Sequence, residues 1–392
     1  MYDVMQLRKD FPVLDRVIYL DSAATSQTPR PVVEAMNEYF FEYASNYGRG
    51  AYKLARTTTE RYDGARRKVA KFMGAKECQT IFTKNTTEAI NMVALGMKWS
   101  KGDHIITSIL EHHSNFLPWL RLRPKGVEVT VIESDRQGIL SPESIEEAIT
   151  ERTKLIAITH ISNVFGSILN IQEIAKIAHE NGAALLVDGA QSLGHMPMDV
   201  EKLDCDFLAF PGHKGLLAPP GTGVLYVKHP DQLEPVYSGG GAIKSVTRDS
   251  FELDESPACF EPGTPNIPGI IGLGAAVEYV ENVGITDIEH HVTSLARDAA
   301  SRLAELPNVE VYGPSERAGV VSFNVASMDS HDVSTMLDEH GICTRSGHHC
   351  AMPAHQFLGI HGSVRASFAL YNTQEEVDAL VDVIKDITRT LT

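Results

Sequence analysis

The sequence of 392 residues lacks the features of several large protein classes. Its five cysteines are an odd number without a Cys-x-x-Cys pair, so neither a disulfide framework nor a standard zinc site is indicated. Lysine and arginine number 35 against 51 acidic residues, a formal charge of −16. Neither a nucleic acid nor an anionic membrane is therefore expected as a main partner, because both require basic patches. No apolar run approaches the roughly 18 residues of a membrane span. A signal peptide would begin with a basic segment followed by an apolar one, and the first residues show no such pattern. We therefore expect a cytoplasmic protein.

What the sequence does contain is the alternation of a parallel α/β sheet. From about residue 60 to residue 230, short β-rich runs alternate with amphipathic helical stretches. One helix is predicted to start at Asn85, with Glu88 three residues on as its capping-box partner. The expected strands are Thr80–Thr83, His104–Ser108, Val127–Ile132, Leu155–Thr159, Ala184–Val187, Phe207–Phe210 and Gly223–Val227.

A Pro/Gly-rich stretch at 257–269 interrupts this alternation and marks an expected domain boundary. Beyond it we expect a helix over Ile271–Asn282, strands at Val309–Tyr312 and Val320–Val325, and a last helix after a capping box at Thr373. We therefore predict a large domain over 16–268 and a smaller C-terminal α+β domain over 269–392, with 1–15 packing against the smaller one.

Polar side chains follow five of the predicted strands. Ligands of open parallel sheets bind beyond the carboxyl ends of the strands, so these side chains are the candidate site. Each of them alone has an ordinary explanation, such as a helix cap or a solvated loop. They are Thr86 and Thr87, Glu111-His112-His113, His160 and Asn163, Asp188 and Gln191, and His213-Lys214.

Together these residues supply what pyridoxal phosphate requires. Lys214 is the candidate for the covalent link to the cofactor, and Asp188 is the carboxylate that keeps the pyridine nitrogen protonated. His112 is placed to stack on the ring, and Gln191 to reach the phenolic oxygen. Thr86 and Thr87 stand at a helix N-terminus, where free N–H groups and the helix dipole favour a phosphate.

The most unusual segment is Thr344–Pro353, which contains Arg345, His348, His349 and Cys350. Three interpretations of Cys350 stay open on the residues alone. With His348, His349 and His355 it has the ligand types of a metal site, although not the usual spacing. It could also be a buried, inert cysteine. We favour a nucleophile, because cationic neighbours stabilise the reactive thiolate form. The other cysteines, Cys78, Cys205, Cys259 and Cys343, are expected to serve packing.

Arg365 lies among small and apolar residues in Ser363–Ser367. An arginine in such a setting is either the partner of an internal salt bridge or a fork that binds a substrate carboxylate through two hydrogen bonds.

With these segments the chain resembles the class V aminotransferase family, and within it the group II cysteine desulfurases and selenocysteine lyases. Most specific to that group is the piece from Arg345 to Ala351. The matching pieces span nearly the whole chain in the family's order: Leu20–Ala24, Thr86–Asn91, Glu111–Asn115, Ser162–Gly166, Val187–Gln191, Gly212–Lys214, Gly263–Asn266, Arg345–Ala351 and Arg365–Ser367.

The resemblance implies the fold of type I pyridoxal phosphate enzymes and a desulfurase reaction on L-cysteine. Lys214 would hold the cofactor and move the α-proton, and Asp188 would stabilise the resulting charge. The Cys350 thiolate would attack the substrate sulfur, leaving a persulfide and releasing alanine. Asn163 and Arg365 would bind the substrate carboxylate, with Arg345 at the entrance.

The resemblance also implies a homodimer, with His213 on the phosphate and Thr264 reaching the phosphate of the second copy. A sulfur acceptor, serving iron–sulfur cluster assembly, would receive the persulfide sulfur. Alternatives are a selenocysteine lyase, another enzyme of the same fold with the same cofactor, or a metal-binding or regulatory protein in which Cys350 is not catalytic.

Three departures from the family pattern concern the phosphate site and the substrate entrance. Pro211 stands where a serine is common, and it donates neither a hydroxyl nor an N–H. Ala218 and Pro220 replace a more usual Gly and Thr after the lysine. Gly48 and Tyr52 occupy positions at which many group II members carry histidines.

Overall fold

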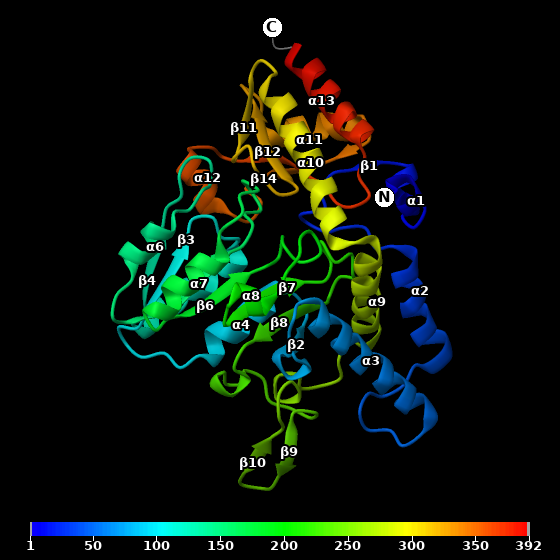
Figure 1. Ribbon diagram of the computed structural model, residues 1–392, viewed down its shortest axis with the longest axis vertical. Coiled ribbons are helices and arrows are strands. Elements are labelled where there is room, and N and C mark those ends of the chain that lie inside the picture. The colour runs from blue at the N-terminus through cyan, green and yellow to red at the C-terminus, as the bar shows by residue number, and fades with distance from the viewer. Residues whose placement is uncertain (1, 390–392) are drawn as a thin grey trace.

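The computed structural model describes residues 2–389, in which a large sheet forms the centre of the lower half of Figure 1. The strand order within this sheet is β2-β8-β7-β6-β5-β3-β4. β8 runs antiparallel to both of its neighbours, while β7, β6, β5, β3 and β4 are mutually parallel. The expected large, mostly parallel sheet is therefore confirmed. The strands are β2 (Thr80–Thr83), β3 (His104–Ser108), β4 (Glu128–Ile132), β5 (Thr153–Thr159), β6 (Ala184–Asp188), β7 (Phe207–Pro211) and β8 (Gly223–Val227).

Both faces of the sheet are covered, which is why its strands are apolar throughout. Successive side chains of β6 point to opposite faces. Leu185 and Val187 join one apolar cluster, which includes α7 and α9, whereas Leu186 joins a second cluster that includes α4. The helices of this part are α2 (Arg30–Glu38), α3 (Lys53–Phe72), α4 (Thr86–Gly96), α5 (Leu117–Leu120), α6 (Pro142–Ala148), α7 (Ile171–Glu180), α8 (Val200–Leu203) and α9 (Ile267–Val283).

The C-terminal part has its own sheet, of strand order β11-β12-β15-β14, and its own apolar core. Phe11 and Leu14 belong to that core, so the N-terminal segment packs there. The elements are α1 (Val4–Arg8), β1 (Ile18–Tyr19), α10 (Ile285–Ala304), β11 (Val309–Tyr312), β12 (Val320–Val325), α11 (Ser330–Glu339), β13 (Ile342–Cys343), β14 (Arg345–Gly347), α12 (Met352–Leu358), β15 (Ser363–Ser367) and α13 (Gln374–Arg389).

Helix α9 joins the two parts, and it starts four residues earlier than predicted. Pro268 is tolerated because it lies in the first turn, and Asn266 caps the helix by accepting from Gly269 N. Residues from Ile267 to Val277 pack in the core beside the large sheet, and Val280 packs in the C-terminal core. The division at residue 268 stays a prediction, and this packing favours a boundary inside α9.

Two further features concern a projecting hairpin and the character of the helices. A hairpin of β9 (Ile243–Val246) and β10 (Phe251–Leu253) projects away from the large sheet at the bottom of Figure 1. Within residues 2–389, no helix is long and apolar enough to cross a membrane.

Candidate active site

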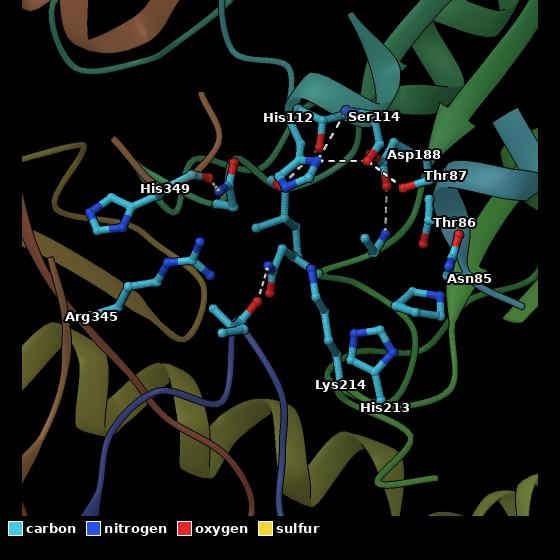
Figure 2. A pocket seen from close by; sticks show the side chains of 18 of the residues that line it. Asn85, Thr86, Thr87, His112, Ser114, Asp188, His213, Lys214, Arg345 and His349 are labelled. Atoms are coloured by element: carbon cyan, nitrogen blue, oxygen red, sulfur yellow. Dashed lines mark hydrogen bonds between the residues drawn. The ribbon is translucent and has the colours of Figure 1, made fainter. Parts of the chain in front are cut away.

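A cavity of about 160 Å³ lies at the carboxyl ends of the parallel strands, where β6 ends at Asp188 and β7 at Pro211. Strand register brings these ends together, since Thr159 pairs with Asp188 and Asp188 with Ala209. Figure 2 shows the Lys214 side chain reaching into the middle, between Thr86 on one side and Arg345 on the other. Of the residues predicted from the sequence, those that line this cavity are Thr86, Thr87, His112, Asn163, Asp188, Gln191, His213, Lys214, Arg345 and Arg365.

One wall of the cavity is the N-terminus of α4. Asn85 caps the helix, its Oδ1 accepting from Glu88 N at 2.9 Å. The reciprocal bond differs from the predicted capping box, because Glu88 Oε2 accepts from Lys84 N rather than from Asn85 N. Thr86 Oγ1 is buried and has no hydrogen-bond partner in the described part of the chain. This wall therefore offers a free hydroxyl at the positive end of a helix dipole.

A chain of hydrogen bonds fixes the His112 ring. Its Nδ1 accepts from Ser114 N at 3.1 Å and lies 2.9 Å from Ser114 Oγ, which in turn lies 2.7 Å from Thr87 Oγ1. Because Nδ1 accepts, the proton of the neutral ring must be on Nε2. Burial, and then the charge of Lys214, lowers the pKa of His112 to about 3, so the ring stays neutral at physiological pH.

Asp188 and Lys214 provide opposite charges on the buried floor of the cavity. Asp188 Oδ1 accepts from Ala190 N at 2.9 Å, and burial raises the pKa of its carboxyl. Burial lowers the pKa of Lys214 to about 8, while Asp188 opposes that change. The amine is therefore far easier to deprotonate than a lysine in water, as a nucleophile or base requires.

Three further histidines in this region are neutral at physiological pH, as His112 is. Burial lowers the pKa values of His160, His195 and His213 to about 4. His213 lines the cavity and its Nδ1 has no partner within residues 2–389.

Two arginines stand on the side that faces the C-terminal part. Arg345 of β14 is paired directly with Arg365 of β15. Arg365 Nη2 donates to Asp21 Oδ1 at 3.0 Å and Nη1 to the carbonyl of Asn163 at 3.3 Å. Arg365 is thus the partner of an internal salt bridge, one of its two predicted roles, and it also lines the cavity.

Cys350 is held next to this arginine pair. Arg345 Nη2 donates to Cys350 Sγ at 3.7 Å. His349 and Cys350 both have left-handed backbone conformations, with φ of 49° and 56°, which is uncommon for residues other than glycine. The loop keeps this shape because Asn163 Nδ2 donates to His349 O at 2.8 Å and His113 N donates to Cys350 O at 2.7 Å. Cys350 itself is not among the residues that line the cavity, but Arg345, which contacts its sulfur, and His349, the residue before it, both do.

The other cysteines differ from Cys350. Cys205 and Cys259 are buried, and burial raises the pKa values of their thiols to about 12 and about 11. Cys343 is half-buried, and burial raises the pKa of its thiol as well. The expected packing role is wrong for Cys78, whose side chain is exposed because it lies in the short turn before β2.

The described residues include no group of three or more His, Cys, Asp or Glu side chains that could hold a metal ion. Two of the candidate ligands are engaged elsewhere, since His349 Nε2 and His355 Nε2 both contact Ser363 Oγ, at 3.0 and 3.1 Å.

Thr264 lies apart from the other predicted residues. It lines a second cavity with Lys84 and Glu88, on the other side of the α4 N-terminus. Pro211 does line the first cavity, so the absence of a hydroxyl and an N–H at this position affects the site directly.

Asn85, Ser114 and His349 also line the cavity. The sequence indicated Asn85 only as a helix cap and His349 only as a candidate metal ligand, and it gave no role to Ser114. The signal for Ser114 is its position two residues after His112, which lets its N–H reach the ring.

Comparison with known proteins shows the family to which the chain belongs. Residues 18–380 match the model of the family described as Aminotransferase class-V, so the chain belongs to the class V aminotransferase family. Within that family it is similar to a probable cysteine desulfurase of Methanothermobacter thermautotrophicus, with 48% identity over 388 residues and 97% of each chain covered. It is 41% identical to a cysteine desulfurase of Escherichia coli, covering 100% of this chain and 99% of that one.

Solved structures give the same result. The structure of the apo cysteine desulfurase from Thermococcus onnurineus superposes with a TM-score of 0.97 at 46% identity, covering 100% of this chain and 99% of that chain. A cysteine desulfurase from Escherichia coli, with its S-sulfonic acid, superposes with a TM-score of 0.93 at 38% identity, with the same coverage.

Proposed function

We propose that this chain is a pyridoxal phosphate-dependent cysteine desulfurase, which converts L-cysteine to L-alanine and retains the sulfur as a persulfide on Cys350. The observation that carries the proposal is the 3.7 Å contact between Cys350 Sγ and Arg345, which lines the same cavity as the buried Lys214. Full-length similarity to cysteine desulfurases supports it.

The cavity residues fit the cofactor. Thr86 Oγ1 and His213 Nδ1 are buried polar atoms without partners in residues 2–389, and Thr86 stands at a helix N-terminus suited to a phosphate. Asp188 would face the pyridine nitrogen, His112 would cover one face of the ring, and Gln191 would lie near its phenolic oxygen. Bound to Lys214, pyridoxal phosphate supplies an electron sink for the negative charge at the substrate Cα.

The protein's own groups then handle the protons. Burial lowers the pKa of the Lys214 amine to about 8, so this amine would be suited to removing the Cα proton and returning a proton to the alanine product. Neutral His112 adds no second positive charge beside it. Arg365 and Asn163 would orient the substrate carboxylate.

In sulfur transfer the thiolate of Cys350 would be the nucleophile, with the bound cofactor as electron sink and Lys214 as proton donor. Its Sγ attacks the substrate Sγ, a new S–S bond forms, and the bond between the substrate Cβ and its sulfur breaks. The electron pair of that bond stays with the carbon, which is protonated and leaves as alanine. Arg345, which lines the cavity, would hold the attacking sulfur through its contact with Sγ.

We further propose that the enzyme acts as a homodimer and passes the persulfide sulfur to an acceptor protein for iron–sulfur cluster assembly. Thr264 lies outside the cavity that its own chain forms, which supports a role across the interface between two copies.

The test compares two cysteine variants of the holoenzyme. Cys350→Ser is expected to abolish alanine release from L-cysteine while the cofactor absorbance stays unchanged. Cys343→Ser, seven positions upstream in β13, is the matched control and should keep its activity. Full turnover by Cys350→Ser would refute the proposed function. Assays with L-selenocysteine, measuring selenide with alanine, determine the substrate preference.

A further inference from the structure

We propose that Asp21 is a positioning residue for the substrate carboxylate. It holds the guanidinium of Arg365 in place, and its negative charge limits how tightly the site binds the carboxylate of both substrate and product. This inference rests on the proposed function, in which Arg365 binds that carboxylate.

The backbone around Asp21 is fixed to the strand that carries Arg365. Asp21 forms a parallel bridge with Ser367, two residues beyond Arg365 in β15. Ser367 N donates to Leu20 O at 2.8 Å, and Ala23 N donates to Ser367 Oγ at 2.9 Å. The backbones that carry the carboxylate and the guanidinium are therefore joined directly to each other.

Arg365 is buried, with 1% of its side chain exposed, and Asp21 keeps 23% exposed. The guanidinium has five N–H donors. One is used by Asp21 and one by the carbonyl of Asn163, and Nε has no partner in the described part of the chain. Asp21 therefore occupies one corner of the fork and leaves unused donors for a second carboxylate.

The negative charge of Asp21 also affects binding at Arg365, beyond holding the guanidinium in place. Arg345 is paired with Arg365 across β14 and β15, and Lys214 lines the same cavity. A buried guanidinium beside other cations is costly without a counter-ion, and Asp21 is the carboxylate that contacts it. When a substrate carboxylate arrives on the remaining donors, it meets the negative charge of Asp21 across the same guanidinium.

The consequence concerns product release. L-Alanine retains the α-carboxylate of L-cysteine, so a contact to that carboxylate tightens the binding of substrate and product alike. Such uniform binding lowers KM without raising kcat. Asp21 offsets part of the attraction of the arginines, and alanine is released more easily.

Two substitutions separate the two roles of Asp21. Asp21→Asn keeps an oxygen that accepts from Arg365 Nη2 and removes the charge. Asp21→Ala removes both, so the guanidinium loses its support. Asp15→Asn, an exposed position on the same N-terminal segment, is the matched control.

The experiment measures the dissociation constants of L-alanine and ethylamine for the holoenzyme by titration calorimetry. For Asp21→Asn, the constant for L-alanine is expected to fall about 10-fold, the order of one like charge removed from a partly buried site. Ethylamine, which lacks the carboxylate, should gain no affinity. For L-cysteine turnover, KM should fall with the alanine constant while kcat does not rise. Asp21→Ala should weaken alanine binding, and Asp15→Asn should change neither ligand.

The proposal is overturned if Asp21→Asn leaves the alanine constant unchanged or weakens it as Asp21→Ala does. Equal tightening of alanine and ethylamine would also overturn it, because the effect would not involve the carboxylate. The proposed function fails separately, if the wild-type holoenzyme releases no alanine from L-cysteine, since the binding measurements do not depend on turnover.

Discussion

The guanidinium of Arg345 lies 3.7 Å from the sulfur of Cys350, measured from Nη2 to Sγ. Arg345 also lines the cavity that contains Lys214, so one side chain contacts the thiol and borders the site in which the substrate would bind. His349 and Cys350, beside this contact, both have left-handed backbone conformations.

The free hydroxyl of Thr86 gives a prediction with an internal control. Thr86→Val should weaken binding of pyridoxal phosphate by about 10-fold, because the phosphate loses one hydrogen bond worth about 1.5 kcal/mol. Thr107 in β3 also has a buried, unpartnered Oγ1 within residues 2–389, but it does not line the cavity. Thr107→Val should therefore leave cofactor binding unchanged. Equilibrium titration with pyridoxal phosphate, followed by visible absorbance, measures the cofactor affinity of both variants. Equal losses of affinity would contradict the assignment of Thr86 to the phosphate.

Burial of Lys214 predicts a pH-dependent stability of the cofactor-free protein. Its pKa is lowered from 10.5 to about 8, a difference of 10.5 − 8 = 2.5, which corresponds to about 3 kcal/mol. Below pH 8 the charged amine destabilises the folded state. As the pH rises from 8 to 10.5, the unfolded chain holds the proton longer than the folded one, so this penalty disappears.

Lys214→Met should accordingly increase the free energy of unfolding at pH 7, and the gain should vanish above about pH 10.5. Urea denaturation at several pH values measures it. Lys176→Met, at an exposed position, is the control. A gain that stays constant with pH would show that packing, rather than charge burial, is responsible.

Burial of Glu111 should give a pH dependence of stability opposite in sign to that caused by Lys214. Its side chain is fully buried, accepting from Ser108 Oγ and Asn115 Nδ2 at 2.6 Å each, and burial raises the pKa of its carboxyl from 4.5 to about 8. The folded state holds this proton more tightly, so its stabilising effect is complete below pH 4.5 and is lost as the pH rises through 8.

Glu111→Gln cannot titrate, so the stability of the variant relative to wild type should increase between pH 4.5 and pH 8. Urea denaturation across this range measures the difference. Glu180→Gln, at an exposed site, should show no such trend. A flat difference for Glu111→Gln would mean that the carboxyl is ionised throughout.

The buried ion pair between Arg66 and Glu261 fixes α3 to the segment before α9. Two bonds of 2.7 and 2.8 Å join the side chains, and Phe82 N also donates to Glu261 at 2.7 Å. Glu261→Gln should lower the free energy of unfolding by about 3–5 kcal/mol, since a buried guanidinium loses its counter-ion. The exposed pair of Arg61 and Glu38, at 2.8 Å, is the matched control, and Glu38→Gln should cost less than about 1 kcal/mol. Similar losses of unfolding free energy in the two variants, measured by chemical denaturation, would show that burial does not set the strength of the ion pair.

Much of the fold follows from local pattern. Each predicted strand of the large sheet is present within two residues, because β-rich apolar runs between turn residues have few alternatives. The start of α9 at Ile267 was missed, since Pro268 indicates a break unless the cap at Asn266 is known. Exposure of Cys78 was missed for a related reason: burial of a single side chain depends on neighbours that are distant in sequence.

The sequence by itself determined the set of chemical groups: a lysine, an aspartate and two threonines at strand ends, two arginines, and one cysteine among cationic residues. Only the tertiary structure decided which of them meet. Thr86, Asp188 and Lys214 share a cavity because the strands of one sheet end at the same edge. Arg365 contacts Asp21, 344 positions away, and Thr264 lies outside the cavity, because contacts at such separations follow from the packing of the two cores rather than from local pattern.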